Sequence, residues 1–224
     1  MLAMTSIANQ IIDPLTVEAA KTLEDWPEWQ VSIENELDIH KRLGIGELIT
    51  PLPNVNIVRS HIVLCYKLGK DGSVSSQKLR LVAQGFTQCK GIDFNETFSP
   101  IAKLTAIWII AAITVRNDWE LKQMDVDAAY LNASLKENIY MRQPKGIKVP
   151  SQEDKVIHLK QAIYGQGQSG RKWYEDLMST LTNVNFQRCK VEHAMFYQFD
   201  QDAMILAVDV DDITVARNSP RAIQ

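Results

Sequence analysis

An acidic run framed by two apolar β-type runs places the strongest constraint on how this chain folds. Residues 209–212 read D-V-D-D and lie between the apolar stretches Met204–Val208 and Ile213–Ala216. Such a pattern predicts an antiparallel hairpin that carries the acids at a tight turn. Neighbouring carboxylates in an apolar frame need a compensating charge, and divalent cations supply the strongest one. The alternative is an acidic hairpin tip that faces water.

A third carboxylate ends a separate alternating run. Asp125 follows the stretch L-K-Q-M at 121–124 and lies 86 positions before Asp211. If these strand ends meet, Asp125, Asp211 and Asp212 form a cluster of oxygen ligands. Mg²⁺ prefers oxygen ligands and keeps coordination positions for water or phosphate. The acids therefore predict a site for two Mg²⁺ ions, with Mn²⁺ as a possible substitute.

The formal charge of −3 hides two segments of opposite sign. Residues 1–58 carry nine acidic and three basic side chains, a net of −6. Residues 59–90 carry six basic side chains against one acidic, a net of +5. A basic segment of this kind suits a polyanion such as nucleic acid. The alternative is a solvated hairpin with lysines on its wet face.

The basic segment also has the pattern of a β-hairpin. Alternation over Ile57–Leu68 and Val74–Ala83 predicts two strands, and G-K-D-G at 69–72 predicts the turn between them. Alternate residues of a strand share a face, so Lys78 and Arg80 point the same way. Three apolar residues occupy the other face: Leu79, Leu81 and Ala83.

The remaining pattern mixes helices and strands without a regular βαβ rhythm, which predicts an α+β fold. Helices are predicted over Trp26–Leu43, Leu104–Val115 and Ser169–Val184. Leu104–Val115 is nearly all apolar, which predicts a helix buried between layers. Further strands are predicted over Trp119–Val126, Glu137–Met141, Val156–Leu159 and Met195–Phe199.

Composition narrows the class of protein. With 46% apolar and 23% charged residues, the 224-residue chain can bury a core. No apolar run approaches the roughly 18 residues of a membrane span, and no secretory signal is visible. Three cysteines without a C-x-x-C pair indicate reduced thiols. We expect an intracellular, cytoplasmic protein with no membrane partner.

A series of motifs resembles the reverse transcriptases of copia-type retrotransposons. Residues 80–88, R-L-V-A-Q-G-F-T-Q, resemble the family motif K-A-R-L-V-A-x-G-F-x-Q, with Lys78 and Arg80 on its basic positions. Residues 91–100, G-I-D-F-N-E-T-F-S-P, resemble G-I-D-Y-x-E-T-F-A-P. Further matches follow in the family's order: Q-M-D-V at 123–126, A-Y-L-N at 129–132, I-Y-M-R-Q-P at 139–144, I-Y-G at 163–165, R-K-W-Y at 171–174 and V-D-D at 210–212.

The resemblance implies the fingers and palm of a reverse transcriptase, with an antiparallel palm sheet backed by helices and with the thumb absent. It divides the chain into four parts. They are a poorly ordered leader at 1–25, a fingers-like region with the basic hairpin at 26–103, a palm-like region with the carboxylate cluster at 104–216, and a truncated tail at 217–224.

The resemblance also implies roles for individual residues. Asp125, Asp211 and Asp212 would be catalytic and, with Val126, would hold two Mg²⁺ ions that activate the primer 3′-hydroxyl and stabilise the leaving group. The nucleotide-binding residues would be Lys78, Arg80, Val126, Tyr130 and Gln168. Tyr130 would lie under the sugar and exclude a 2′-hydroxyl, although a core tyrosine fits its sequence context equally well.

The function implied is RNA-directed DNA polymerisation by part of a retrotransposon Pol polyprotein, located by analogy in a virus-like particle. Its partners would be an RNA template, a DNA primer, deoxynucleoside triphosphates, and polymerase thumb and nuclease segments present elsewhere. Asp209 stands where the family usually has an aromatic residue, and it adds a like charge beside the acids. A decayed, non-catalytic remnant with weak nucleic-acid binding is therefore a second hypothesis, and a palm-type nucleotide cyclase is a third.

Overall fold

Strands from the middle of the chain return to pair with strands near its start, so the molecule divides into two units that each combine two stretches of sequence. The computed structural model describes residues 11–200 and 202–218. The first unit contains the residues up to Gln88 together with Asn138–Gln166. The second contains Cys89–Glu137 together with the residues from Gly167 onward. The boundary between a fingers-like and a palm-like region at residues 103 and 104, which the resemblance implied, stays a prediction.

The first unit contains the basic hairpin in the predicted place. β3 (Ser60–Leu68) and β4 (Val74–Ala83) pair in antiparallel register. The turn between them is closed by the Gly69 N–H, which donates to the Ser73 carbonyl at 2.8 Å. One face of β4 is buried, as the alternation predicted, through Leu79, Leu81 and Ala83.

The predicted strand Ile57–Leu68 is interrupted at Arg59, because its two parts pair with different partners. The first two residues run parallel to β6, whereas the rest pairs with β4. A strand that changes partner must break its ladder at the point of change. Across the resulting four-stranded sheet the strands follow the order β1 (Gly46–Ile49), β7 (Val156–Gln161), β6 (Ser134–Arg142) and β2 (Ile57–Val58).

A long helix, α2 (Trp26–Arg42), protects the outer edge of β4 and confirms the predicted helix to within one residue. The Leu79 N–H donates to Ser32 Oγ at 3.0 Å, and the Leu81 N–H donates to Glu36 Oε1 at 2.9 Å. An unpaired strand edge is a template for aggregation, and these helix side chains occupy its donors. Polar residues on the inner face of α2 therefore have a structural role.

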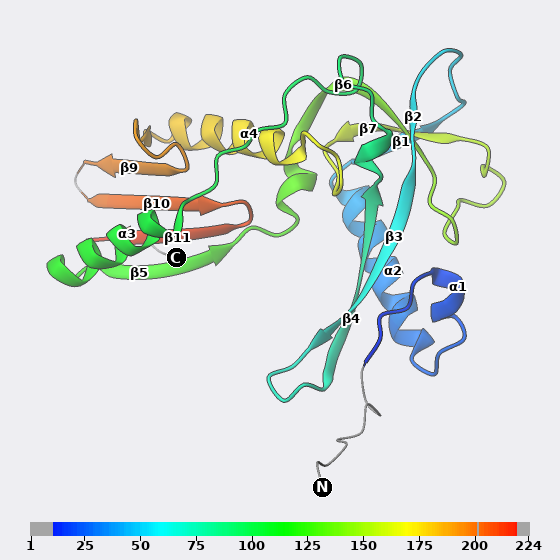
Figure 1. Ribbon diagram of the computed structural model, residues 1–224, viewed down its shortest axis with the longest axis horizontal. Coiled ribbons are helices and arrows are strands. Elements are labelled where there is room, and N and C mark those ends of the chain that lie inside the picture. Colours follow the sequence, from blue (N-terminus) through cyan, green and yellow to red (C-terminus); the bar gives the residue numbers. More distant parts are fainter. Residues whose placement is uncertain (1–10, 201, 219–224) are drawn as a thin grey trace, which may run out of the picture. The chain divides into compact units, whose positions relative to one another are not determined.

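The second unit is built on a five-stranded antiparallel sheet, drawn in Figure 1 with β11 between β5 and β10. Across the sheet the strands are β5 (Glu120–Asp125), β11 (Asp212–Arg217), β10 (Ala203–Asp209), β9 (Met195–Phe199) and β8 (Gln187–Arg188). Each unit also contains one of the two 3₁₀ turns of the described residues: η1 (Gly85–Thr87) lies in the first unit and η2 (Ala129–Asn132) in the second.

One helix covers each face of this sheet. Ile110 of α3 (Leu104–Asn117) packs in one core cluster with Ile205 and Ala207 of β10. The intervening residues of β10 point to the opposite face, where α4 (Ser169–Asn183) contributes Tyr174, whose ring lies 6.3 Å from that of Phe196. The central strands β10 and β11 are thereby largely buried, whereas the edge strands β5 and β8 have no buried residue.

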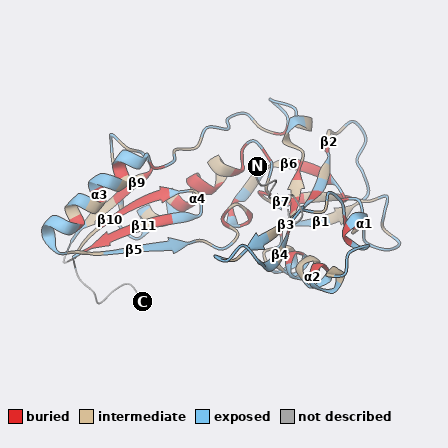
Figure 2. Cartoon of the chain, turned by 60° about the horizontal axis from the view of Figure 1, so that its bottom comes forward, coloured by how far each residue is buried: buried red, intermediate tan, exposed pale blue. Residues whose placement is uncertain are grey.

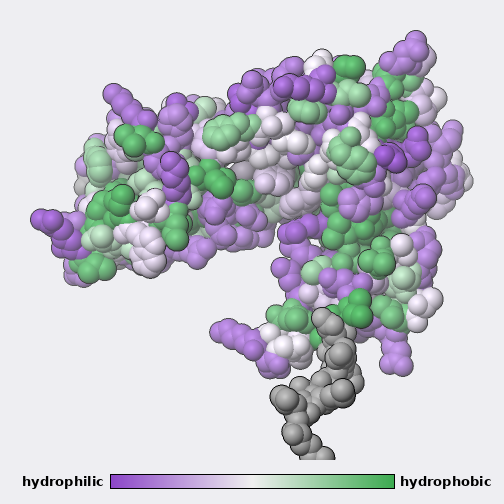
Figure 3. All heavy atoms as spheres, in the orientation of Figure 1, coloured by the Kyte–Doolittle hydropathy of each residue, from purple (hydrophilic) through white to green (hydrophobic). Residues whose placement is uncertain are grey.

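The prediction that α3 is buried between layers is wrong. Only Ala106, Ile110 and Thr114 of the helix are buried, and its outer face is coloured as exposed in Figure 2. Apolar residues gather on the surface over α3 (Figure 3), and four of them are more than half exposed: Leu104, Trp108, Ile109 and Val115. The helix has apolar residues on all of its sides, but the sheet contacts only one side.

The expected leader and tail fall partly outside the described residues, at 1–10 and 219–224. Residues 11–25 contain the short helix α1 (Val17–Ala20), which buries Val17. Its N-terminus is capped by Thr16 Oγ1, which accepts from the Ala19 N–H at 3.0 Å. None of the helices in the described part of the chain combines the length and apolar character that a membrane crossing requires.

The contact between Glu36 and the β4 edge predicts a stability difference between two substitutions. Glu36→Leu leaves the buried Leu81 N–H without an acceptor and should lower the free energy of unfolding by about 1–3 kcal/mol. Glu36→Gln keeps an acceptor oxygen and should lose less. Urea denaturation of the full chain measures both, and equal midpoints for the two variants would refute this role of Glu36.

Candidate active site

The acids predicted from the sequence lie at one end of the second unit's sheet. β10 and β11 pair with Val208 opposite Ile213 and Asp209 opposite Asp212. Val210 and Asp211 are therefore the two central residues of the connecting turn. Val208 and Ile213 are both buried, so the last apolar pair of the hairpin anchors the acidic turn.

β5 brings the third acid to the same place. Its last residue, Asp125, is the direct partner of Asp212 in the antiparallel register. The pairing continues one step beyond the strand, where the Val126 N–H donates to the Asp211 carbonyl at 2.8 Å. Directly opposed residues of an antiparallel pair share a face. The structure thus joins the ends of two strands that are far apart in sequence, as the sequence analysis required.

The donor chemistry fits a hard divalent cation, but the side chains are not arranged as a ligand set. Within residues 11–200 and 202–218, no three His, Cys, Asp or Glu side chains are grouped so that they could hold a metal ion. One oxygen of Asp212, Oδ1, accepts a hydrogen bond from Gln123 Nε2 at 2.9 Å. The backbone therefore places Asp125, Val126, Asp211 and Asp212 together, whereas metal binding by them stays a prediction.

The turn itself is held in an unfavourable backbone conformation. Val210 has φ of 57°, a region in which a β-branched residue is a genuine outlier. Its carbonyl accepts a hydrogen bond of 2.7 Å from Nε1 of Trp173, a buried residue of α4. Strained residues persist where their surroundings hold them, often at functional sites. The sequence analysis placed Trp173 in the predicted helix and in the R-K-W-Y motif but gave it no role, so this support of the turn was missed.

Tyr130 lies in η2, close enough to the acidic turn for the negative charges of the turn to affect its ionisation. Burial raises the pKa of the Tyr130 phenol, and the negative charges of Asp211 and Asp209 raise it further. A Cβ placed on Gly170 at the start of α4 would lie 3.7 Å from the Tyr130 hydroxyl oxygen. The phenol therefore stands between the acidic turn and the start of α4.

The side chain of Gln168 is buried and is not exposed to solvent. Only 1% of its surface is exposed, and its Nε2 donates to the Asp93 carbonyl at 3.0 Å. Asp93 is equally buried, and its Oδ2 accepts from the Cys89 N–H at 2.6 Å. These contacts tie the loop that contains Asp93 to the residue preceding α4. A supporting role of this kind had not been predicted, and nucleotide contact by Gln168 stays a prediction.

The two predicted triphosphate-binding cations belong to the first unit, on β4. Lys78 is exposed and pairs in register with Cys65. Arg80 is partly buried, and its guanidinium carbon lies 4.9 Å from the centre of the Tyr164 ring. Stacking of this kind holds an arginine in one orientation. The buried Nε of Arg80 has no hydrogen-bond partner among the described residues.

The negative charges around Tyr130 predict how a nearby substitution changes the pKa of its phenol. Asp209→Asn removes one of the two nearby negative charges, so the pKa of Tyr130 should fall toward its ordinary value. Phenolate absorbance during an alkaline titration measures it, with Tyr130→Phe identifying the signal among the six tyrosines. An unchanged titration would mean that the Asp209 charge does not reach the phenol.

The raised pKa of Tyr130 also determines the direction in which the stability of the fold changes with pH. Because the folded state holds the phenol proton more tightly, Tyr130 stabilises the fold below its ordinary pKa, and this contribution is lost as the pH rises through the raised value. Tyr130→Phe, which cannot ionise, should lose less stability than the parent chain over that alkaline range. Urea midpoints measured across the range test this expectation, and equal losses for the two chains would contradict it.

Comparison with known proteins agrees with the motifs. The sequence model of the family described as reverse transcriptase (RNA-dependent DNA polymerase) matches residues 52–224. The Pol polyprotein from transposon RE2 of Arabidopsis thaliana is 34% identical over 216 residues, which is 96% of this chain and 15% of that protein. The Pol polyprotein from transposon TNT 1-94 of Nicotiana tabacum is 36% identical over 154 residues, which is 67% of this chain and 12% of that protein.

A third relative gives the same result over nearly the whole chain. The Pol polyprotein from transposon RE1 of Arabidopsis thaliana is 33% identical over 204 residues, or 90% of this chain and 14% of that protein. The chain thus spans about 15% or less of the length of these relatives. The family match covers more than three quarters of the chain, and it includes the strands that bear the acids. The chain belongs to the reverse transcriptase family, among the copia-type Pol polyproteins.

Proposed function

We propose that this chain forms the fingers and palm of a copia-type reverse transcriptase and adds deoxynucleotides to a DNA primer on an RNA template. The observation that carries the proposal is the strand register that sets Asp125 opposite Asp212 and joins Val126 to Asp211. The second unit corresponds to the palm in this proposal, and the hairpin of β3 and β4 corresponds to the fingers. A thumb and nuclease segments would be supplied from elsewhere in a Pol polyprotein.

The acids would hold two Mg²⁺ ions, or Mn²⁺ in their place. Asp125, Asp211, Asp212 and the Val126 carbonyl are the proposed ligands, and the bound ions would neutralise charge on the reacting phosphate. Before an ion binds, Asp212 is oriented by Gln123 and the turn at Val210 is held by Trp173. These contacts would reduce the reorganisation that ion binding requires.

The remaining residues would position the nucleotide. Lys78 and Arg80 share a face of β4 and would neutralise the triphosphate, where cations oppose the charge that develops during phosphoryl transfer. Tyr130 would contact the sugar, because its phenol lies near the acidic turn. Gln168 would act near the nucleotide, and its bond to the Asp93 carbonyl would keep the start of α4 in place. We place this activity in a cytoplasmic virus-like particle.

A second candidate function is a non-catalytic remnant that binds nucleic acid weakly. One observation favours it: Asp209 is the cross-strand partner of Asp212. Like charges directly opposite each other destabilise an antiparallel pair. An extra acid at this position would also compete for the cations that the other three are proposed to bind.

Primer extension on an RNA template in Mg²⁺ tests the proposal. The parent chain should extend the primer, and Asp211→Asn should lower the rate by about 100-fold or more because it removes a ligand and a charge from the reacting centre. Asp154→Asn makes the same chemical change on an exposed loop of the first unit and should leave the rate unchanged.

Substitution of Asp209 separates the two candidate functions. Asp209→Tyr removes the like charge opposite Asp212, so it should raise the extension rate of an active enzyme. The same primer-extension assay measures it. If the parent extends no primer in Mg²⁺ or Mn²⁺, the non-catalytic remnant is the correct function, and extension by Asp209→Tyr alone would identify Asp209 as the cause of the loss.

A further inference from the structure

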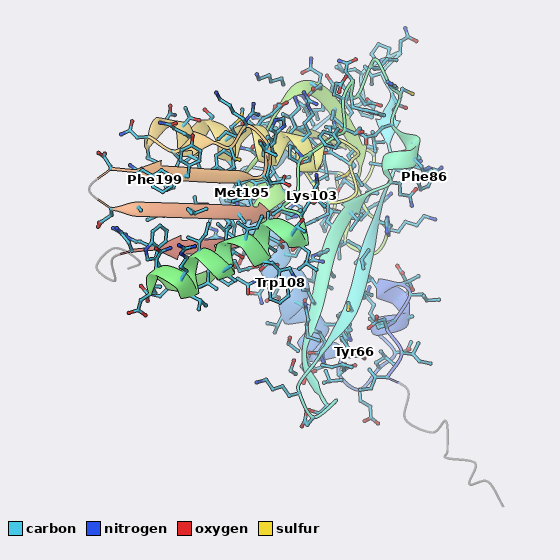
Figure 4. All side chains as sticks on the ribbon, turned by 60° about the vertical axis from the view of Figure 1, so that its left-hand side comes forward. Tyr66, Phe86, Lys103, Trp108, Met195 and Phe199 are labelled. Atoms are coloured by element: carbon cyan, nitrogen blue, oxygen red, sulfur yellow. The ribbon has the colours of Figure 1, made fainter. Side chains whose placement is uncertain are left out.

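Phe86 is an aromatic residue exposed on a loop whose own backbone is tightly fixed. It lies in η1, and 79% of its surface is exposed. Figure 4 shows the ring beside η1, projecting away from the body of its unit. A single exposed apolar residue needs no explanation by itself. The contacts of this loop, however, hold the backbone that carries the ring in one place.

Thr87, the next residue, is the centre of the loop's hydrogen bonds. Its Oγ1 donates to the Gln84 carbonyl at 2.7 Å and accepts from the Arg59 N–H at 3.0 Å. Its carbonyl accepts from Asn56 Nδ2 at 3.0 Å. The Gln84 N–H in turn donates to the Arg59 carbonyl at 2.7 Å. The loop is therefore tied twice to the backbone of Arg59, which lies 28 residues before Thr87.

Two glycines let this loop lie directly against another segment of the same unit. A Cβ at Gly85 would clash with the Gly165 carbonyl oxygen, and a Cβ at Gly165 would clash with the Ala83 carbonyl oxygen. Gly165 also has φ of 83°, which disfavours any other residue. The inner side of the loop is thus packed backbone against backbone.

Arg59 supplies a positive charge to the exposed ring. Its guanidinium carbon lies 5.4 Å from the centre of the Phe86 ring, within the range of a cation–π interaction. No carboxylate within residues 11–200 and 202–218 forms an ion pair with Arg59. The two side chains thus form a planar apolar surface with an unneutralised cation beside it.

Other exposed aromatic residues lack this combination. Phe199 packs against Tyr197, with ring centres 5.3 Å apart, and Trp108 stands on the apolar outer face of α3. Neither of them is paired with a cation in the described part of the chain, and the same holds for Phe98, which is 72% exposed. A surface for another protein's apolar residues would resemble the α3 face. An aromatic ring backed by arginine instead matches the platforms that bind single-stranded nucleic acid, where bases stack and cations attract phosphate.

We infer that Phe86 and Arg59 form a stacking platform for an unpaired base of single-stranded RNA. The base would stack on the open face of Phe86, and Arg59 would back the ring and attract the adjoining phosphate. The inference rests on the proposed function, since it gives the RNA template of that function a contact outside the residues assigned to nucleotide and metal binding.

Fluorescence anisotropy of a labelled oligouridylate of about 20 nucleotides, without metal or nucleotide, tests the platform. Phe86→Ala should weaken binding by about 5- to 100-fold, and Phe86→Trp should retain it. Phe199→Ala, the matched control, should bind like the parent. Phe86 is exposed, so its variants should keep the parent's melting temperature and their binding can be compared directly.

An oligomer of the same length with abasic riboses separates stacking from charge. The parent and Phe86→Ala should bind it equally, whereas Arg59→Ala should weaken binding to both oligomers. The platform is refuted if Phe86→Ala binds oligouridylate like the parent, if it also weakens binding of the abasic oligomer, or if the parent binds neither. The proposed function fails separately, by absence of primer extension in Mg²⁺ and Mn²⁺.

Discussion

The pairing of β5 with β11 is the contact on which the candidate active site depends. It sets Asp125 opposite Asp212 and continues through the hydrogen bond between Val126 and Asp211. Side chains alternate along a strand, so a slip of one residue would send Asp125 to the other face of the sheet. The buried residues of β10 and β11 hold the acidic turn in place against α3 and α4, whereas β5 has no buried residue and is held by its pairing with β11. Core packing therefore places Asp211 and Asp212, and strand pairing brings Asp125 to them.

The environment of the turn fits a site that is fixed before any ligand binds. Val210 is held in a strained conformation while α4 supplies a hydrogen bond to its carbonyl through Trp173. Buried Gln168 ties the residue preceding α4 to the loop at Asp93. The helix that supports the acidic turn is thus itself anchored. Asp209 destabilises this arrangement, since it places a second carboxylate, in addition to that of Asp125, opposite Asp212.

Local patterns predicted most of the fold. The bounds of β4 and β9 agree with the predicted strands because alternation and turn residues act within a few positions. The break at Arg59 was not predictable in the same way, because it depends on β2 pairing with the distant strand β6. The exposure of Trp108 was missed for a related reason: apolar content does not tell how many faces of a helix are covered. The sequence pattern alone gave the meeting of the acids only as a condition, since Asp125 and Asp212 are neighbours only through strand pairing.

The melting temperature with and without Mg²⁺ tests most directly whether these acids form a cation site. An ion that binds only the folded chain raises its melting temperature. We expect millimolar Mg²⁺ to raise that of the parent by a few degrees and to leave that of Asp125→Asn and Asp211→Asn nearly unchanged. In a chelator, both variants should melt at or above the parent, because each relieves repulsion between like charges. The account would be contradicted if Mg²⁺ left the melting temperature of the parent unchanged, or if it raised that of the variants as much as that of the parent.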